Sequence, residues 1–150
     1  MEAIKKALTF DDVLLIPKFS STLPTETNLS INLAKNLKLK IPFLSSAMDT
    51  VTESNMAIAI AHQGGLGVIH RNLSINSQVK EIKKVKNKKL LVGAAVGTSE
   101  EDILRAKSIL DAGLDLLVID TAHGHSLKVI NTLKKIRKFS NKIPICVGNI

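Results

Sequence analysis

The sequence is poor in cysteine and in aromatic side chains. Its 150 residues include one cysteine, no tryptophan and no tyrosine, and aromatic residues make up 3% of the chain. The single cysteine, Cys146, has no partner for an internal disulfide and provides no zinc-binding framework of its own, which fits a reducing compartment. The scarcity of aromatic residues also leaves few of the stacking surfaces on which single-stranded nucleic acids are bound.

Long apolar runs are absent as well. The longest runs, at residues 90–96 and 114–119, fall well short of the roughly 20 residues of a membrane-spanning helix. The first residues lead into a polar stretch, without an apolar region and a small-residue cleavage site, so no signal peptide is visible. The sequence therefore predicts a cytoplasmic protein with no membrane partner.

The chain has the balance of a globular protein with a buried core, because 45% of its residues are hydrophobic and 23% are charged. Its formal net charge is +8, and the basic residues gather in two clusters, at residues 80–89 and 134–142. Both clusters lie at the ends of predicted helices, where lysine complements the helix dipole and usually forms a solvated face. The charge pattern does not favour nucleic acid as a partner.

From residue 41 onward, short β-like runs alternate with amphipathic helical stretches, which predicts βαβ units and an α/β fold with a parallel sheet. Predicted strands cover residues 42–45, 67–70, 90–96, 114–120 and 143–147, and predicted helices cover residues 52–63, 76–85, 100–112 and 127–139. A capping box is expected at Thr50–Glu53, and Ser99 and Ser126 are expected to cap the third and fourth helices. Residues 1–40 are predicted to be an irregular segment that packs on the barrel, with a short ribbon near residues 30–33.

Residues 41–150 thus supply about four βα units and a fifth strand. This count predicts the N-terminal half of a (β/α)8 TIM barrel, a fold that typically needs about 250 residues. An open, doubly wound sheet of five strands is the alternative. In both folds the functional groups lie at the carboxyl ends of the strands, so these ends define the candidate site.

Several strand ends carry polar residues. Ser46 and Thr50 follow the first strand, where they either hold a phosphate beside a helix start or only serve the turn and the cap. His70 ends the second strand and is either a ligand contact or a structural hydrogen-bonding residue. Alternation along the fifth strand predicts that Cys146 is buried and inert, while Asn149, after that strand, can donate and accept hydrogen bonds.

The fourth strand ends in the most unusual segment, residues 120–126. A carboxylate directly after a buried strand is costly unless it has a partner, so Asp120 is predicted to be functional, for example by accepting the hydroxyls of a ribose. The pair His123 and His125 lacks an accompanying cluster of ligands, so no metal site is predicted.

These segments, taken together, resemble the inosine-5'-monophosphate (IMP) dehydrogenase family. The likeness rests on residues 8–15 (LTFDDVLL), 48–53 (MDTVTE), 64–70 (GGLGVIH), 92–96 (VGAAV) and 119–126 (IDTAHGHS), and it extends from residue 8 to Asn149. The related guanosine monophosphate reductase shares the barrel and is the alternative, although Thr52, Glu53 and the segment 122–126 look like the dehydrogenase.

The resemblance implies an NAD-dependent oxidoreductase that converts IMP to xanthosine monophosphate in guanine nucleotide synthesis and assembles as a homotetramer. It implies that Ser46 and Met48 contact the nucleotide, and that Asn149 lies at the reacting centre and also contacts the substrate. By the same likeness, Asp120, with Thr121 and Ala122 beside it, holds the nicotinamide ribose of NAD.

Two departures from the family pattern are expected. The regulatory cystathionine-β-synthase-like domains are absent, because residues 85–89 run directly into the third strand. The nucleophilic cysteine loop, the mobile flap and the potassium site of the family are expected outside this chain, in a C-terminal half of the barrel. The isolated chain is therefore predicted to be inactive, and a non-catalytic nucleotide-binding or phosphate-binding module stays open as a further alternative.

Overall fold

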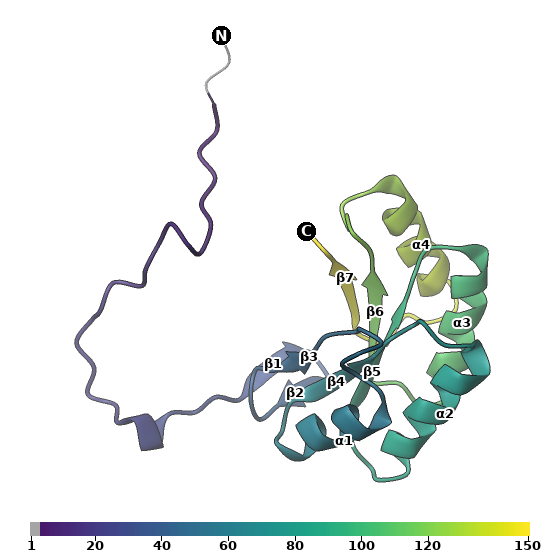
Figure 1. Cartoon of the computed structure of the whole chain (residues 1–150), viewed down its shortest axis with the longest axis horizontal. Coiled ribbons are helices and arrows are strands. Elements are labelled where there is room, and N and C mark those ends of the chain that lie inside the picture. Colours follow the sequence, from purple (N-terminus) through teal and green to yellow (C-terminus); the bar gives the residue numbers. More distant parts are fainter. Residues whose placement is uncertain (1–3) are drawn as a thin grey trace.

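A computed structural model describes residues 4–150 and shows a curled sheet of five parallel strands (Figure 1). The strands are β3 (Leu44–Ser45), β4 (Leu66–Ile69), β5 (Val92–Val96), β6 (Leu116–Asp120) and β7 (Ile145–Gly148), and the helices are α1 (Ser54–His62), α2 (Ile75–Lys86), α3 (Glu100–Asp111) and α4 (Leu127–Arg137). The strands lie side by side in sequence order. A doubly wound sheet reverses its strand order, so this arrangement confirms the half-barrel and excludes the open alternative.

The two faces of the sheet have different cores. On the convex face, side chains such as Ile69, Val96 and Ile119 pack against helix residues that include Ile82 and Ile109, and all five are fully buried. Because side chains alternate along a strand, the neighbouring positions point to the concave side, where Val68, Ala95 and Leu116 form a second cluster. The helices thus cover the outside of the half-barrel.

A two-stranded antiparallel ribbon contributes to the concave cluster. It consists of β1 (Ile31–Ala34) and β2 (Leu37–Leu39), which contains the buried side chains of Leu37 and Leu39. The ribbon expected near residues 30–33 is therefore present. Before it, the chain forms one short 3-10 turn, η1 (Pro24–Glu26), and residues 4–29 extend away with exposed side chains (Figure 1). For this part, packing on the barrel stays a prediction.

Local signals set most of the helix ends. The Ser99 hydroxyl accepts a hydrogen bond from the N–H of Asp102 (3.1 Å) and caps α3, and Ser126 caps α4 in the same way. Gly113 has a φ of +90°, which a residue with a side chain rarely adopts, and it ends α3 as expected.

The expected capping box at residues 50–53 is wrong. Helix α1 begins at Ser54, and its N-cap residue Glu53 makes no side-chain capping bond. The Thr52 side chain is instead turned toward the loop after β3, and the helix start is completed from a neighbouring helix, because the Glu81 carboxylate in α2 accepts the N–H of Ser54 (2.9 Å). The hydrogen bonds that Glu81 accepts from Ser54 and Lys84 outweigh the effect of burial and lower its pKa.

No helix within residues 4–150 combines the length and the apolar character that crossing a membrane requires.

Candidate functional site

The carboxyl ends of β3, β6 and β7 bring four of the predicted site residues to one cavity. Ser46, Met48, Asp120 and Asn149 all line a cavity of about 320 Å³ at this edge of the sheet. Its floor is the concave face of the strands, including Val118. Residues separated by about 100 positions in the sequence thus meet here because parallel strands end at the same edge.

A second cavity, of about 380 Å³, adjoins the first and shares Ala47, Met48 and Asp120 with it. Its other wall is the turn after β4, which contributes Arg71 and Asn72. The Asn72 side-chain amide donates to Asp49 (2.9 Å) and so ties this turn to the loop after β3. We call the two cavities together the strand-end cleft.

Thr52 fixes the loop that carries Ser46 and Met48. Its side chain is fully buried, and its hydroxyl donates to the carbonyl oxygen of Ser46 (2.6 Å) and lies 2.8 Å from the hydroxyl oxygen of Ser45. The N–H of Thr52 also donates to the Met48 carbonyl oxygen (3.0 Å). One buried side chain therefore determines how the loop enters the cleft, and the sequence patterns gave it only a helix-start role.

His70 is held as a structural residue at the edge of the cleft. The imidazole side chain is 3% exposed, its Nδ1 accepts the N–H of Asn72 (3.1 Å), and its Nε2 lies 3.3 Å from a Glu53 carboxylate oxygen. Since Nδ1 is an acceptor, the proton lies on Nε2 and is donated to Glu53. Of the two interpretations, these bonds support the structural one.

Asp120 has a different environment from the other polar groups. The residue is half-buried and lines both cavities of the cleft, yet its carboxylate has no hydrogen-bond or ion-pair partner within residues 4–150. A carboxylate that is partly removed from water without a partner is suited to receive donors from a ligand.

Thr121 and Ala122 lie next to Asp120 but are not among the residues that line the two cavities. The Thr121 hydroxyl and N–H both donate to the Gly148 carbonyl oxygen (2.9 Å each), and the N–H of Asn149 donates back to Thr121 (2.7 Å). The N–H of Gly124 donates to the Asn149 carbonyl oxygen (2.6 Å). Thr121 thus holds the end of β7, and with it Asn149, in place.

The expectation that Cys146 is buried is wrong. Its neighbours Ile145 and Val147 face the helices, so alternation places Cys146 on the concave side, opposite Val118 on β6. No other described element covers this side of β7, and the thiol is exposed and lines the cleft.

A larger single cavity, of about 670 Å³, lies elsewhere. It is formed by the C-terminal part of α3 and the loops before β6 and β7, with Lys107 placed over the ring of Phe139 (5.2 Å from its centroid). It therefore lies at the amino ends of the strands, where residues of this fold generally serve stability. The strand-end cleft remains the candidate site because the half-buried, unpartnered carboxylate of Asp120 lies there.

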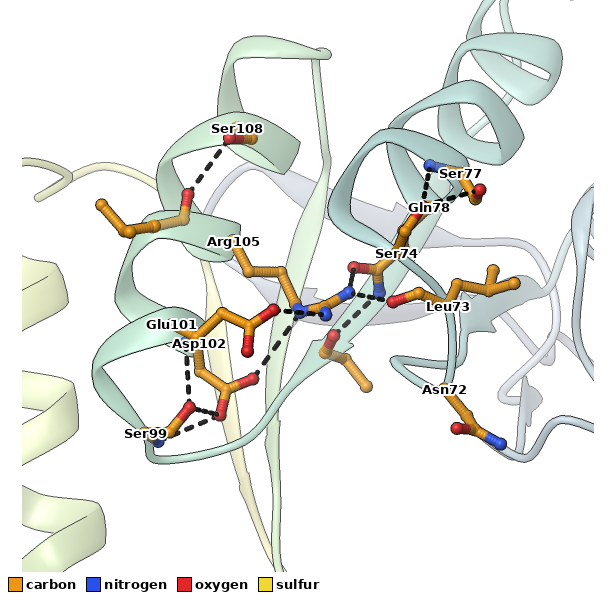
Figure 2. A network of polar contacts seen from close by, with 12 residues as sticks. Asn72, Leu73, Ser74, Ser77, Gln78, Ser99, Glu101, Asp102, Arg105 and Ser108 are labelled. Atoms are coloured by element: carbon orange, nitrogen blue, oxygen red, sulfur yellow. Dashed lines mark hydrogen bonds and ion pairs between the residues drawn. The ribbon is translucent and has the colours of Figure 1, made fainter.

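Sequence reasoning also missed a buried polar pair behind the cleft, formed by Gln78 in α2 and Arg105 in α3 (Figure 2). Gln78 lies four and seven residues before Ile82 and Val85, on the buried face of its helix. A polar residue at an apolar position of the helical repeat was the available signal.

Comparisons with known proteins cover nearly the whole chain. A family model described as "IMP dehydrogenase / GMP reductase domain" matches residues 7–150. Among curated proteins, the inosine-5'-monophosphate dehydrogenase of Borreliella burgdorferi is 43% identical and aligns with 97% of this chain and 48% of its own length. The enzyme of the same name from Cryptosporidium parvum is 42% identical and aligns with 98% of this chain and 47% of its own length.

The chain spans about half the length of the curated relatives it matches. The alignments are also longer than the chain itself, with 196 positions for Borreliella burgdorferi and 275 for Aquifex aeolicus, against 150 residues here. The relatives therefore contain residues inside the matched region that have no counterpart in this chain, as a missing inserted domain would require.

Proposed function

The chain belongs to the IMP dehydrogenase / GMP reductase family, and from this we propose that it contributes half of a (β/α)8 barrel that oxidises IMP to xanthosine monophosphate with NAD. The observation that carries the proposal is the strand-end cleft, in which Ser46, Met48, Asp120 and Asn149 meet although the sequence separates them widely. The curated relatives named for this enzyme support it.

On the substrate side, we assign the nucleotide to the loop after β3 and the end of β7. Ser46 offers a hydroxyl and Met48 an apolar surface that is 54% exposed, a combination suited to a phosphorylated sugar and to a purine ring, respectively. Asn149 offers both a donor and an acceptor at the opposite wall, where the hydrogen bonds of Thr121 and Gly124 fix its backbone. In this assignment Asn149 orients the reacting purine.

On the cofactor side, the residues present fit a ribose. The unpartnered carboxylate of Asp120 can accept both hydroxyls of the nicotinamide ribose, and Thr121 and Ala122 follow it in the chain, beside the residues that line the cleft. NAD, when bound, supplies the hydride acceptor. In this assignment Asp120 orients the ribose, and Thr121 keeps the ends of β6 and β7 together.

The covalent part of the reaction is assigned to the half of the relatives that this chain does not span. The family's nucleophilic cysteine, its flap with the water-activating base and its potassium site belong there by resemblance, whereas Cys146 does not lie in the nucleophile motif. The proposal therefore requires that this chain, supplied alone, is inactive.

The test is an assay of NADH formation by absorbance, with IMP and NAD, on the chain alone and after mixing with a separately produced C-terminal half of the barrel. Activity is expected only on mixing, and Asp120→Asn is expected to raise the KM for NAD. Asp111→Asn, on the exposed end of α3, is the matched control. Activity in the chain alone would contradict the assignment of the nucleophile, and oxidation of NADPH with GMP would support the reductase instead.

We further propose that this chain associates with a partner and that the complete protein is a cytoplasmic homotetramer. The sheet has two edges, β3 and β7, and an open edge strand carries unpaired backbone groups that favour pairing with another chain. Light scattering is expected to show self-association of the isolated chain, and a monomer that unfolds cooperatively would contradict it.

A further inference from the structure

A fully buried amide links the ends of two neighbouring strands. Nε2 of Gln78 donates to the carbonyl oxygens of His70 (3.0 Å) and Ala95 (2.9 Å), so that one side chain of α2 bridges the end of β4 and β5. Its Oε1 accepts from Nη1 of Arg105 (3.1 Å), which reaches across from α3 (Figure 2). The amide thus uses its donors on the strands and its acceptor on the arginine.

Arg105 holds the other end of the same turn. Its Nη1 also donates to the carbonyl oxygen of Leu73 (2.9 Å), so the pair holds the backbone at His70 and at Leu73, both in the connection between β4 and α2. The two residues left between these anchors, Arg71 and Asn72, are exposed and line the strand-end cleft.

Gln78 and Arg105 fill the space between α2 and α3 at a cost in free energy. Burying an amide and a guanidinium costs free energy unless each polar group finds a partner, and Nε of Arg105 has no hydrogen bond to any group within residues 4–150. An Asp102 carboxylate oxygen lies 3.7 Å from this Nε and a Glu101 oxygen lies 3.8 Å from Nη2, so the two carboxylates neutralise the charge at a distance. Apolar side chains would pack α2 against α3 without this cost, so packing alone does not account for the pair.

Asp102 extends the network to the cleft. It is buried, and its Oδ2 accepts the hydroxyl (2.6 Å) and the N–H (3.0 Å) of Ser99. Burial raises the pKa of Asp102, but these hydrogen bonds and the charge of Arg71 outweigh it and lower the pKa. A Cβ on Gly97 would lie 2.6 Å from that same oxygen and 3.2 Å from Nη1 of Arg71, so glycine leaves space for both groups.

We propose that Gln78 and Arg105 are positioning residues, which hold the turn of residues 70–73 in the conformation that presents Arg71 and Asn72 to the nucleotide and cofactor in the cleft. The functional part rests on the proposed function. The geometric part can be tested without a ligand, because loss of the hydrogen bonds from Gln78 and Arg105 must release the turn.

The first experiment observes the turn directly in the isolated chain. Nitrogen-15 spectra of the histidine rings report which nitrogen bears the proton, and His70, assigned with His70→Gln, is expected to be almost entirely in the Nε2–H form. Gln78→Glu keeps the shape of the side chain and its bond to Arg105 but removes the donors to the His70 and Ala95 carbonyl oxygens. It is expected to produce a mixture of tautomers and to shift the Asn72 amide signal.

Two control variants separate positioning from a general loss of stability. Gln63→Glu makes the same change at the exposed end of α1. Arg137→Lys replaces another arginine that donates to backbone carbonyl oxygens, those of Ile143 (2.7 Å) and Ser140 (3.3 Å). These residues lie at the amino ends of the strands, away from the cleft. Both are expected to leave the His70 spectrum unchanged, even where Arg137→Lys lowers the unfolding midpoint.

Arg105→Lys provides the second variant if Gln78→Glu does not fold, because lysine keeps the charge but not the forked donors. It is expected to change the His70 spectrum in the same direction. A lowered unfolding midpoint with an unchanged His70 spectrum in Arg105→Lys would overturn the proposal and leave the pair a structural role only.

The second experiment measures kinetics after mixing with the C-terminal half. Arg105→Lys is expected to raise the KM for IMP or NAD by about tenfold with a much smaller change in kcat, since a displaced turn weakens ligand binding more than it affects the reacting atoms. If the wild-type mixture is inactive, the proposed function fails, while the His70 spectrum still decides whether the pair positions the turn. An active Arg105→Lys mixture with unchanged KM for both ligands would overturn its functional part.

Discussion

Replacing Thr52 by valine should destabilise the chain and disturb the cleft at the same time. Valine has nearly the same shape, so the change removes only the hydroxyl, which donates to the Ser46 carbonyl oxygen and meets the hydroxyl of Ser45. Each buried hydrogen bond contributes about 1 kcal/mol net, which gives a loss of about 2 kcal/mol for the two. With a urea slope of about 2 kcal/mol/M, the unfolding midpoint should fall by about 1 M.

Thr52→Ser is the matched control. It keeps the hydroxyl and removes one buried methyl group, which should cost about 0.8 kcal/mol, or about 0.4 M of urea. The serine variant should keep the loop conformation, and only the valine variant should change the amide signals of Ser46, Ala47 and Met48. If valine proves no more destabilising than serine, the hydroxyl contributes nothing net, and the account of the loop is refuted.

Three further predictions concern the rest of the fold. Gly97→Ala should lower the free energy of unfolding by about 1–3 kcal/mol in urea titrations, because the new methyl group would overlap Asp102. Leu117→Ala should cost about 2–5 kcal/mol in the same titrations, since this side chain is fully buried in the convex core. Stability should also decline as the pH falls below about 4.5, the ordinary pKa of glutamate. The folded-state pKa values of Glu81 and Asp102 are lowered, so their contribution is complete above their unfolded values and is lost as they become protonated. Glu81→Gln should make this decline shallower in thermal unfolding followed across pH.

The elements whose signals are local could be predicted from the sequence. Ser99 and Gly113 delimit α3 as expected, because a capping hydroxyl and a left-handed glycine act on the backbone within a few residues. The strands followed from their apolar runs, and the meeting of Ser46, Asp120 and Asn149 followed from the rule that parallel strands end at one edge.

The errors and omissions all depend on contacts between distant parts of the chain. Thr50 and Glu53 have the spacing of a capping box, but the Glu53 carboxylate lies beside His70 instead. The N–H of Ser54 at the start of α1 is accepted by Glu81, which comes 27 residues later in the chain. The side chains of β7 alternate as expected, yet Cys146 is exposed, because the helices cover only the face to which Ile145 and Val147 point. The bonds of Gln78 to Ala95 and Arg105 join α2 to β5 and α3, and no single segment contains that information.

The two walls of the cleft are built by different means, and this determines how each responds to substitution. At β6 and β7 the wall is held mainly by backbone groups, through the bonds that Thr121 exchanges with Gly148 and Asn149. At β3 and β4 it is held by buried side chains that reach the loops from behind, namely Thr52, Gln78 and Arg105. Backbone bonds survive most side-chain replacements, whereas a buried side chain that is lost leaves its carbonyl partners without a donor. Variation that adjusts ligand binding without contacting the ligand should therefore concentrate behind the β3 and β4 wall.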